Sequence, residues 1–326
     1  MSTSQLCHAV GLPRTKANPS LTAAHYFAMW TTLDGLFPGG LGLDDIKGLV
    51  RRPLNAQAIA FSASHDVATG LARVALLKPL SGPGQLTLSG DQAVTVMIKH
   101  RGEPPPMTFG RVEVVHLIEL MRFYSQHYVR PLKASFPDAS KQPHWFADYL
   151  SCEVVDGPLS LTLAPEDAQR ALIPDMAEPM GPAVRHRLAA ESATAATEDR
   201  LRAVLTDILP SGRADAGSAA RRLGMSKRSL QRRLQKNGAS FGTVLDGVRQ
   251  ELALYYLRHD DLRSEEIAIL LAFRDPNSFY RAFQAWTGMT PRAARAAQRQ
   301  VGTGVAPRGP APIAAFRPPQ ASTRLA

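Results

Sequence analysis

The sequence has few cysteines, no long apolar run and no excess of acidic residues. Its 326 residues include only Cys7 and Cys152, which argues against a disulfide framework and, at this spacing, against a zinc site. No run of about 18 or more consecutive apolar residues occurs, so we expect no membrane-spanning helix. The N-terminus has no basic segment followed by an apolar one, which predicts a cytoplasmic protein without a secretory signal.

Positive charge is distributed unevenly along the chain. Residues 1–197 contain 17 Lys and Arg against 17 Asp and Glu, whereas residues 198–326 contain 21 against 11. The whole net charge of +10 therefore belongs to the C-terminal part. Such an asymmetry indicates a polyanionic partner for that part alone.

Residues 216–237 are predicted to form a helix, a tight turn and a second helix. Between Arg221 and Lys236 this segment contains seven basic residues and no acidic one. Gly224 lies where the turn is expected, and Ser226 lies where the N-cap of the second helix belongs.

The second helix of this segment has one apolar side, because Leu230 and Leu234 lie one turn apart. Arg can bond both acceptors of a guanine edge, and Gln can pair with an adenine edge. On the opposite side we therefore expect four base-reading residues: Arg228, Gln231, Arg232 and Gln235. The remaining basic residues are predicted phosphate contacts: Arg221, Arg222, Lys227, Arg233 and Lys236.

Residues 264–287 repeat the same order, with Asp275 or Pro276 opening the second helix. The aromatic residues Phe279, Phe283 and Trp286 recur at helical spacing, which predicts that they are core rather than a stacking platform for bases. The opposite side supplies three further candidate base-reading residues: Asn277, Ser278 and Arg281.

The segment between these two units, residues 240–261, has apolar residues at helical spacing and predicts one long helix. Such a helix would hold the two units at a fixed separation. Successive major-groove faces on one side of B-DNA are roughly 34 Å apart. The C-terminal part, residues 198–299, is thus predicted to be all-α, with two helix-turn-helix motifs joined by a long helix.

Residues 1–180 read as an α+β domain with its own core. Helices are expected at 21–37 and at 110–132, the latter ended by Pro131. A β-hairpin is expected at 84–102 around Gly90-Asp91, followed by strands within 133–140 and 151–165. Residues 181–197 are predicted to be a linker, and the Pro-, Ala- and Arg-rich residues 300–326 a disordered tail.

Residues 199–297 resemble the AraC/XylS family of bacterial transcription regulators. The motifs LGMSKRSLQRRL, FGTVLDGVRQELALYYL and EEIAILLAFRDPNSFYRAFQAWTGMTP carry the resemblance. It implies a seven-helix DNA-binding unit with two helix-turn-helix motifs. By position, it places base reading at Arg228, Gln231 and Arg232 in the first motif, and at Pro276, Asn277, Ser278 and Arg281 in the second. Ala272 departs from the family, which usually has Gly in that turn, so a left-handed Ala272 would be strained by about 1 kcal/mol.

The N-terminal part resembles the arabinose-binding-type domain found in some of these regulators. The phrases HRGEPPP, RVEVVHLIELMRFYSQHYV and WFADYLSCEVVDGPLSLTLAPEDAQRAL carry this resemblance. It implies sensing of an unknown small-molecule effector, dimerisation, or both. The expected partners are double-stranded DNA, RNA polymerase, that effector and a second copy of the chain, with no membrane.

Two other classes of function were weighed against a regulator. For an enzyme, the sequence offers no catalytic residue, metal ligand set or cofactor-binding motif: Cys152 lacks nucleophile-elbow glycines and reads as a small buried residue. An architectural DNA binder would have basic residues spread over its surface rather than gathered on one helix. The separate, electrically neutral N-terminal part argues for regulation by a ligand or partner rather than for an architectural role.

Overall fold

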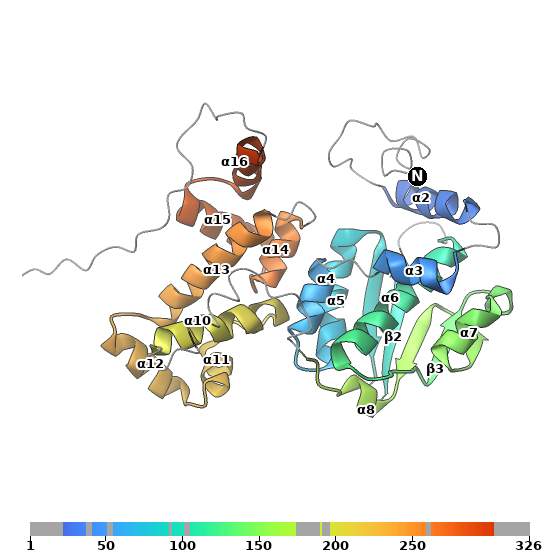
Figure 1. The fold of residues 1–326 in the computed structure, drawn as a ribbon, viewed down its shortest axis with the longest axis horizontal. Helices are drawn as coiled ribbons and strands as arrows, with labels where there is room; N and C mark the ends of the chain where they lie inside the picture. The colour runs from blue at the N-terminus through green and yellow to red at the C-terminus, as the bar shows by residue number, and fades with distance from the viewer. Residues whose placement is uncertain are drawn as a thin grey trace, which may run out of the picture.

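The computed structural model shows two regions that differ in secondary structure (Figure 1). It describes residues 22–36, 41–50, 55–90, 93–100, 105–173, 190, 196–258 and 262–302. The region up to residue 173 combines helices with one sheet, and the region from residue 196 is helical. The predicted order of an α+β part before a helical part is therefore confirmed. The predicted linker and tail fall almost wholly outside the described residues.

The N-terminal region contains a five-stranded mixed sheet with the strand order β1-β2-β5-β3-β4. Strand β3 is antiparallel to β5 and parallel to β4, and every other pair is antiparallel. The predicted hairpin is the β1–β2 pair, in which Gly84 lies opposite His100. Gly90 follows β1 with φ +98°, and a Cβ there would clash with the carbonyl of Ala93, so the turn requires glycine. The strands are β1 (Gly84–Ser89), β2 (Val94–His100), β3 (Lys133–Phe136), β4 (Val154–Asp156) and β5 (Ser160–Leu163).

The longest N-terminal helix, α6 (Met107–Ser125), packs through the core of this region. Val114, Ile118 and Met121 recur at helical spacing, which predicts one buried side, and all three are completely buried. The predicted end at Pro131 is wrong. The helix stops at Ser125 because Gln126 adopts the left-handed conformation, with φ 53°, five residues before the proline.

The other N-terminal helices surround α6 and the sheet. The sequence pattern did not predict α3, α4 and α5, although Asn55 and Asp66 supply N-cap signals. Each side chain accepts a hydrogen bond from a backbone N–H three residues later, at 2.7 Å. These helices are α2 (Ala23–Gly35), α3 (Leu43–Val50), α4 (Ala56–Ser62), α5 (Val67–Ser81), α7 (His144–Leu150) and α8 (Pro165–Ala168), with the 3₁₀ turn η1 (Ala139–Lys141).

The C-terminal region is a set of helices around one apolar core. Its elements are α10 (Thr197–Ile208), the 3₁₀ turn η3 (Leu209–Ser211), α11 (Ala216–Arg222), α12 (Lys227–Lys236), α13 (Phe241–Leu257), α14 (Ser264–Leu270), α15 (Pro276–Thr287) and α16 (Pro291–Gly302). The predicted start of a disordered tail at residue 300 is wrong, because the alanine-rich α16 extends to Gly302. Within the described part of the chain, no helix is both long and apolar enough to cross a bilayer.

The helix pairs α11–α12 and α14–α15 share one turn geometry. Gly224 and Ala272 both have positive φ, at 67° and 55°. The next residue in each turn donates its N–H back to a carbonyl five residues earlier: Met225 to Ala220 at 3.0 Å, and Phe273 to Ala268 at 2.9 Å. This is the Schellman pattern of helix termination. The predicted left-handed conformation of Ala272 is confirmed.

The two regions contact each other through α4 and α5 on one side and η3 and α14 on the other. Ala56, Ile59, Ala60 and Leu77 belong to the core of the C-terminal region. The guanidinium of Arg73 donates to the carbonyls of Pro210, at 3.1 Å, and of Ile269, at 2.8 Å. Apolar burial and a bidentate arginine thus join the regions.

The matched turns make opposite predictions for two substitutions. Gly224→Ala should lower the free energy of unfolding by about 1 kcal/mol, because its Cβ meets open space and only the left-handed backbone opposes it. Ala272→Gly should raise it by about 0.5–1 kcal/mol, because it removes the same strain at some cost in chain entropy. Urea denaturation of the two variants measures both effects. Destabilisation by Ala272→Gly would contradict the strain.

Candidate nucleic-acid interface

Helix α12 presents a polar, basic face to solvent while its apolar side is buried. Leu230 and Leu234 have 0% exposure. The side chain of Ser226 accepts the backbone N–H of Ser229 at 3.1 Å, so the predicted N-cap is confirmed. All four candidate base-reading residues of this helix are exposed: Arg228, Gln231, Arg232 and Gln235.

The five predicted phosphate-contact residues of the first helix pair are also exposed. Arg221 and Arg222 lie on α11, and the others lie on α12: Lys227, Arg233 and Lys236. No carboxylate among the described residues pairs with any of these cations, and Arg221 makes only a 3.4 Å contact with the Ser218 hydroxyl. Unpaired cations on one surface can neutralise phosphates without first breaking an internal ion pair.

Helix α15 is organised differently at its N-terminus. Asp275 is the N-cap, and Pro276 is the first helical residue, as expected. Ser278 donates its backbone N–H to Asp275 at 2.9 Å and its hydroxyl to the same carboxylate at 2.6 Å. These hydrogen bonds from Ser278 hold the pKa of Asp275 below its usual value.

The candidate base-reading residues of α15 are drawn into this cap. Arg281 donates to the Ser278 hydroxyl at 3.1 Å, whereas Asn277 is exposed. The hydroxyl of Ser278 therefore already donates one hydrogen bond and accepts another within the protein. Its side chain has fewer hydrogen-bonding groups available for a base than the exposed side chain of Asn277 has.

The aromatic residues of α15 lie on its inner side. Phe279 and Phe283 have 0% exposure, and their rings are 5.7 Å apart. Trp286 is half-buried against the same core, 6.2 Å from the ring of Phe273. The prediction that these side chains are core is confirmed for the two phenylalanines, and Trp286 packs at the margin.

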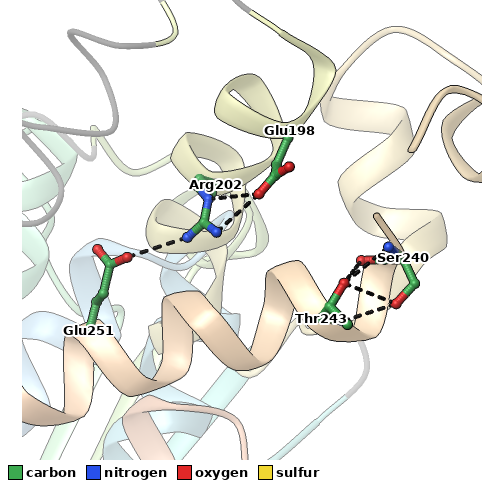
Figure 2. A network of polar contacts seen from close by, with 5 residues as sticks. All are labelled: Glu198, Arg202, Ser240, Thr243 and Glu251. Carbon is green, nitrogen blue, oxygen red and sulfur yellow. Dashed lines mark hydrogen bonds and ion pairs between the residues drawn. The ribbon is translucent and has the colours of Figure 1, made fainter. Parts of the chain in front are cut away.

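Helix α13 connects the two pairs and is held at both ends. Ser240 and Thr243 form its capping box, with the Thr243 N–H to Ser240 Oγ distance at 3.1 Å (Figure 2). The apolar residues at helical spacing in this segment include Val248, Leu252 and Tyr255, which predicts Tyr255 on the buried side. The structure buries Tyr256 completely and leaves Tyr255 half-buried, because the predicted stripe drifts by one residue at this end.

A charged network fixes α10 against α13. Arg202 pairs with Glu198 of its own helix at 3.0 Å and with Glu251 of α13 at 3.3 Å (Figure 2). Its guanidinium also lies against Gly247, where a Cβ would be 3.3 Å from Nη1. The long helix is thereby tied to the first helix of the C-terminal region.

Arg249 of α13 holds the second helix pair. Its guanidinium donates to the carbonyls of Leu271 and Ala272, both at 3.0 Å, and lies 4.3 Å from the ring centroid of Phe273. It therefore caps the C-terminus of α14 and stabilises the strained turn before α15. We call Arg202 and Arg249 the positioning arginines.

The positioning arginines were not among the residues predicted from the sequence. Arg249 did carry a signal, because it falls on the stripe of Leu245, Leu252 and Tyr256 at helical spacing. A charge on an apolar stripe indicates a buried partner. For Arg202, no local sequence pattern indicates that Glu251, on another helix, is its partner.

The side chains that could act as a nucleophile, an acid or base, or a metal ligand do not form a catalytic site in the described residues. Cys152 was expected to be buried and is half-buried, and burial raises the pKa of its thiol, opposite to the activation of a nucleophile. Burial, followed by the charge of Lys78, lowers the pKa of His116 to about 3. Across the described ranges, no three His, Cys, Asp or Glu side chains come together as a metal site.

Comparison with known proteins identifies relatives of part of the chain. Residues 219–297 match the family described as a helix-turn-helix domain. The Ornithine utilization regulator of Pseudomonas aeruginosa is 49% identical over 77 residues, which are 24% of this chain and 23% of that protein. The HTH-type transcriptional regulator VirS of Mycobacterium tuberculosis is 33% identical over 102 residues, 31% and 30% of the two chains. The chain thus spans less than a third of the length of the curated relatives it matches.

The role of Arg249 predicts a loss of stability on its removal. Arg249→Met should lower the free energy of unfolding by about 2 kcal/mol, because two carbonyls lose a charged donor. Urea denaturation measures this change. Arg233→Met on the exposed face of α12 is the matched control and should change stability by less than about 0.5 kcal/mol. Equal effects of the two substitutions would contradict a positioning role.

Proposed function

The C-terminal region carries a helix-turn-helix domain of the AraC type, and on this premise we propose that the chain is a bacterial, cytoplasmic regulator of transcription that binds a specific site on double-stranded DNA. The observation that carries the proposal is α12. It exposes residue types that read base edges, among cations without acidic partners, on a helix whose opposite side is buried.

Both helix pairs act as helix-turn-helix motifs in this proposal. Helices α12 and α15 are the recognition helices, each following a left-handed turn. The 17 residues of α13 rise by about 25 Å. With a recognition helix beyond each end, this connector suits insertion into major-groove faces roughly 34 Å apart.

The two recognition helices contribute unequally. In α12, the four candidate base-reading residues face solvent and form no ion pair with a carboxylate of the described residues. In α15, Pro276 has no N–H for a phosphate, and Arg281 is engaged by Ser278. We therefore assign most of the affinity and base discrimination to α12, with Asn277 and Arg281 reading fewer bases from α15.

The N-terminal region is the effector-sensing or dimerisation domain in this proposal, with boundaries at about 1–180 and a linker at 181–197. Its contacts with η3 and α14 would transmit a change to the DNA-binding region, at 198–299. RNA polymerase is the partner expected at the promoter.

Base reading and phosphate contact predict different outcomes for neighbouring arginines. Arg232→Ala should cost about 1–3 kcal/mol at the specific site and relax the choice of one base. Arg233→Ala should weaken binding to all sequences alike and reduce the salt slope by about 1. Genomic footprinting supplies the site, and titrations on site variants measure both effects. Identical behaviour of the two variants would remove the assignment of Arg232.

Salt dependence tests the electrostatic part of the proposal. If the five predicted phosphate contacts all form, the slope of log K against log salt should be about −4 to −5. Competition with unrelated DNA separates a regulator from an architectural binder. Equal affinity for all duplexes would favour the architectural function, and a flat salt response would exclude α11 and α12 as the footprint.

A further inference from the structure

A cavity of about 470 Å³ lies where the N-terminal region meets the first helix pair. Its volume is within the range of small-molecule sites, roughly 300–1,000 Å³. Ala63 and His65, between α4 and α5, form the N-terminal side. The C-terminal side comes from the end of α10, η3 and α11: Ile208, Ser211, Arg213, Ser218, Arg221 and Arg222.

The lining is strongly basic. Its described residues include three arginines, a histidine and two serines, and none of them is acidic. Arg213 and Arg222 are exposed, and no carboxylate of the described residues pairs with either. Three arginines that line one hollow without an acidic neighbour in the lining raise its positive potential, which favours an anion there.

Asp66 and Asp215, which lie near lining residues along the chain, are engaged by other groups. Asp66 accepts the N–H of Thr69 at 2.7 Å and contacts His65 at 3.1 Å. Asp215 accepts the N–H groups of Gly217 and Ser218, both at 2.9 Å, as the N-cap of α11. Each carboxylate is turned to a helix N-terminus, so neither neutralises the arginines of the cavity.

The loop that supplies Ser211 and Arg213 is held in place by the N-terminal region. Arg73 donates to Pro210, and its guanidinium packs on Gly212, where a Cβ would lie 2.8 Å from Nη1. Gly212 also has φ +82°, which favours glycine. The cavity wall is therefore preorganised by the same contact that joins the two regions.

We propose that this interregion cavity binds a small molecule through a carboxylate or phosphate group, held by Arg213, Arg221 and Arg222. Arginine forms paired, charge-assisted hydrogen bonds with both kinds of oxyanion. The serine hydroxyls and His65 supply further donors. A ligand bound here touches both regions and therefore stabilises their observed arrangement.

This site has a regulatory consequence that rests on the proposed function. Arg221 and Arg222 are also predicted phosphate contacts of the first helix pair. A bound anion would compete for these side chains or fix the orientation of α11, and DNA affinity would change by the same factor as anion affinity. The binding of the anion itself does not depend on DNA.

The test is calorimetric titration of the full chain, without DNA, with inorganic phosphate and separately with succinate at constant ionic strength. We expect saturable binding of one anion per chain for at least one probe, and its identity distinguishes a phosphate ligand from a carboxylate. Arg213→Gln and Arg222→Gln should each weaken that binding at least tenfold. Arg200→Gln, an exposed arginine on α10 outside the lining, is the matched control and should leave it unchanged.

A filling substitution separates the cavity from the basic surface in general. Ala63→Phe should abolish anion binding while every arginine stays in place. Absence of saturable binding by both probes would overturn the proposal, as would equal weakening by Arg200→Gln or unchanged binding in Ala63→Phe. If Arg213→Gln and Arg222→Gln impair only DNA binding, these arginines serve the duplex and the proposal fails. If the chain binds the anion but does not bind DNA, the proposed function fails and the anion site stands.

Discussion

The burial of one side of α13 is the constraint on which the C-terminal region depends. Val244, Val248 and Leu252 are completely or almost completely buried in a core that also receives residues of both helix pairs. Because one core serves both pairs, neither can rotate without disturbing the packing of the other. Arg202 and Arg249 strengthen this arrangement with charged hydrogen bonds at opposite sides of the connector. In the proposed function, two recognition helices on a stiff support would lose little freedom on binding DNA.

Positively charged side chains in this protein have two different roles. The cations of α11 and α12 are exposed and have no acidic partner among the described residues, whereas Arg73, Arg202 and Arg249 form hydrogen bonds that stabilise the fold. Net charge alone does not separate these roles. The separation follows from burial: a guanidinium packed among carbonyls stabilises the fold, and one in solvent remains free for a polyanion.

The contact between the regions links the sensing part of the proposed function to the reading part. Residues of α4 and α5 enter the same core as α10, α13 and α14. The N-terminal region therefore packs on the supporting elements of the helix pairs, while α12 lies at the far side of the C-terminal region (Figure 1). A change in α4 or α5 would reach the recognition helices through their supports rather than through their exposed faces.

The sequence by itself determined the helix pairs, the N-cap of α12 at Ser226 and the exposed residues of α12, because these depend on local spacing and on backbone conformation. It also located the β-hairpin, and it placed the unpaired charge in the C-terminal part. Tertiary structure decided the rest. The strand order, the early end of α6 at Gln126, the positioning arginines and the basic cavity all depend on residues far apart in the chain. No local pattern specifies which distant backbone carbonyl accepts a hydrogen bond from an arginine, because the two come together only when the helices pack.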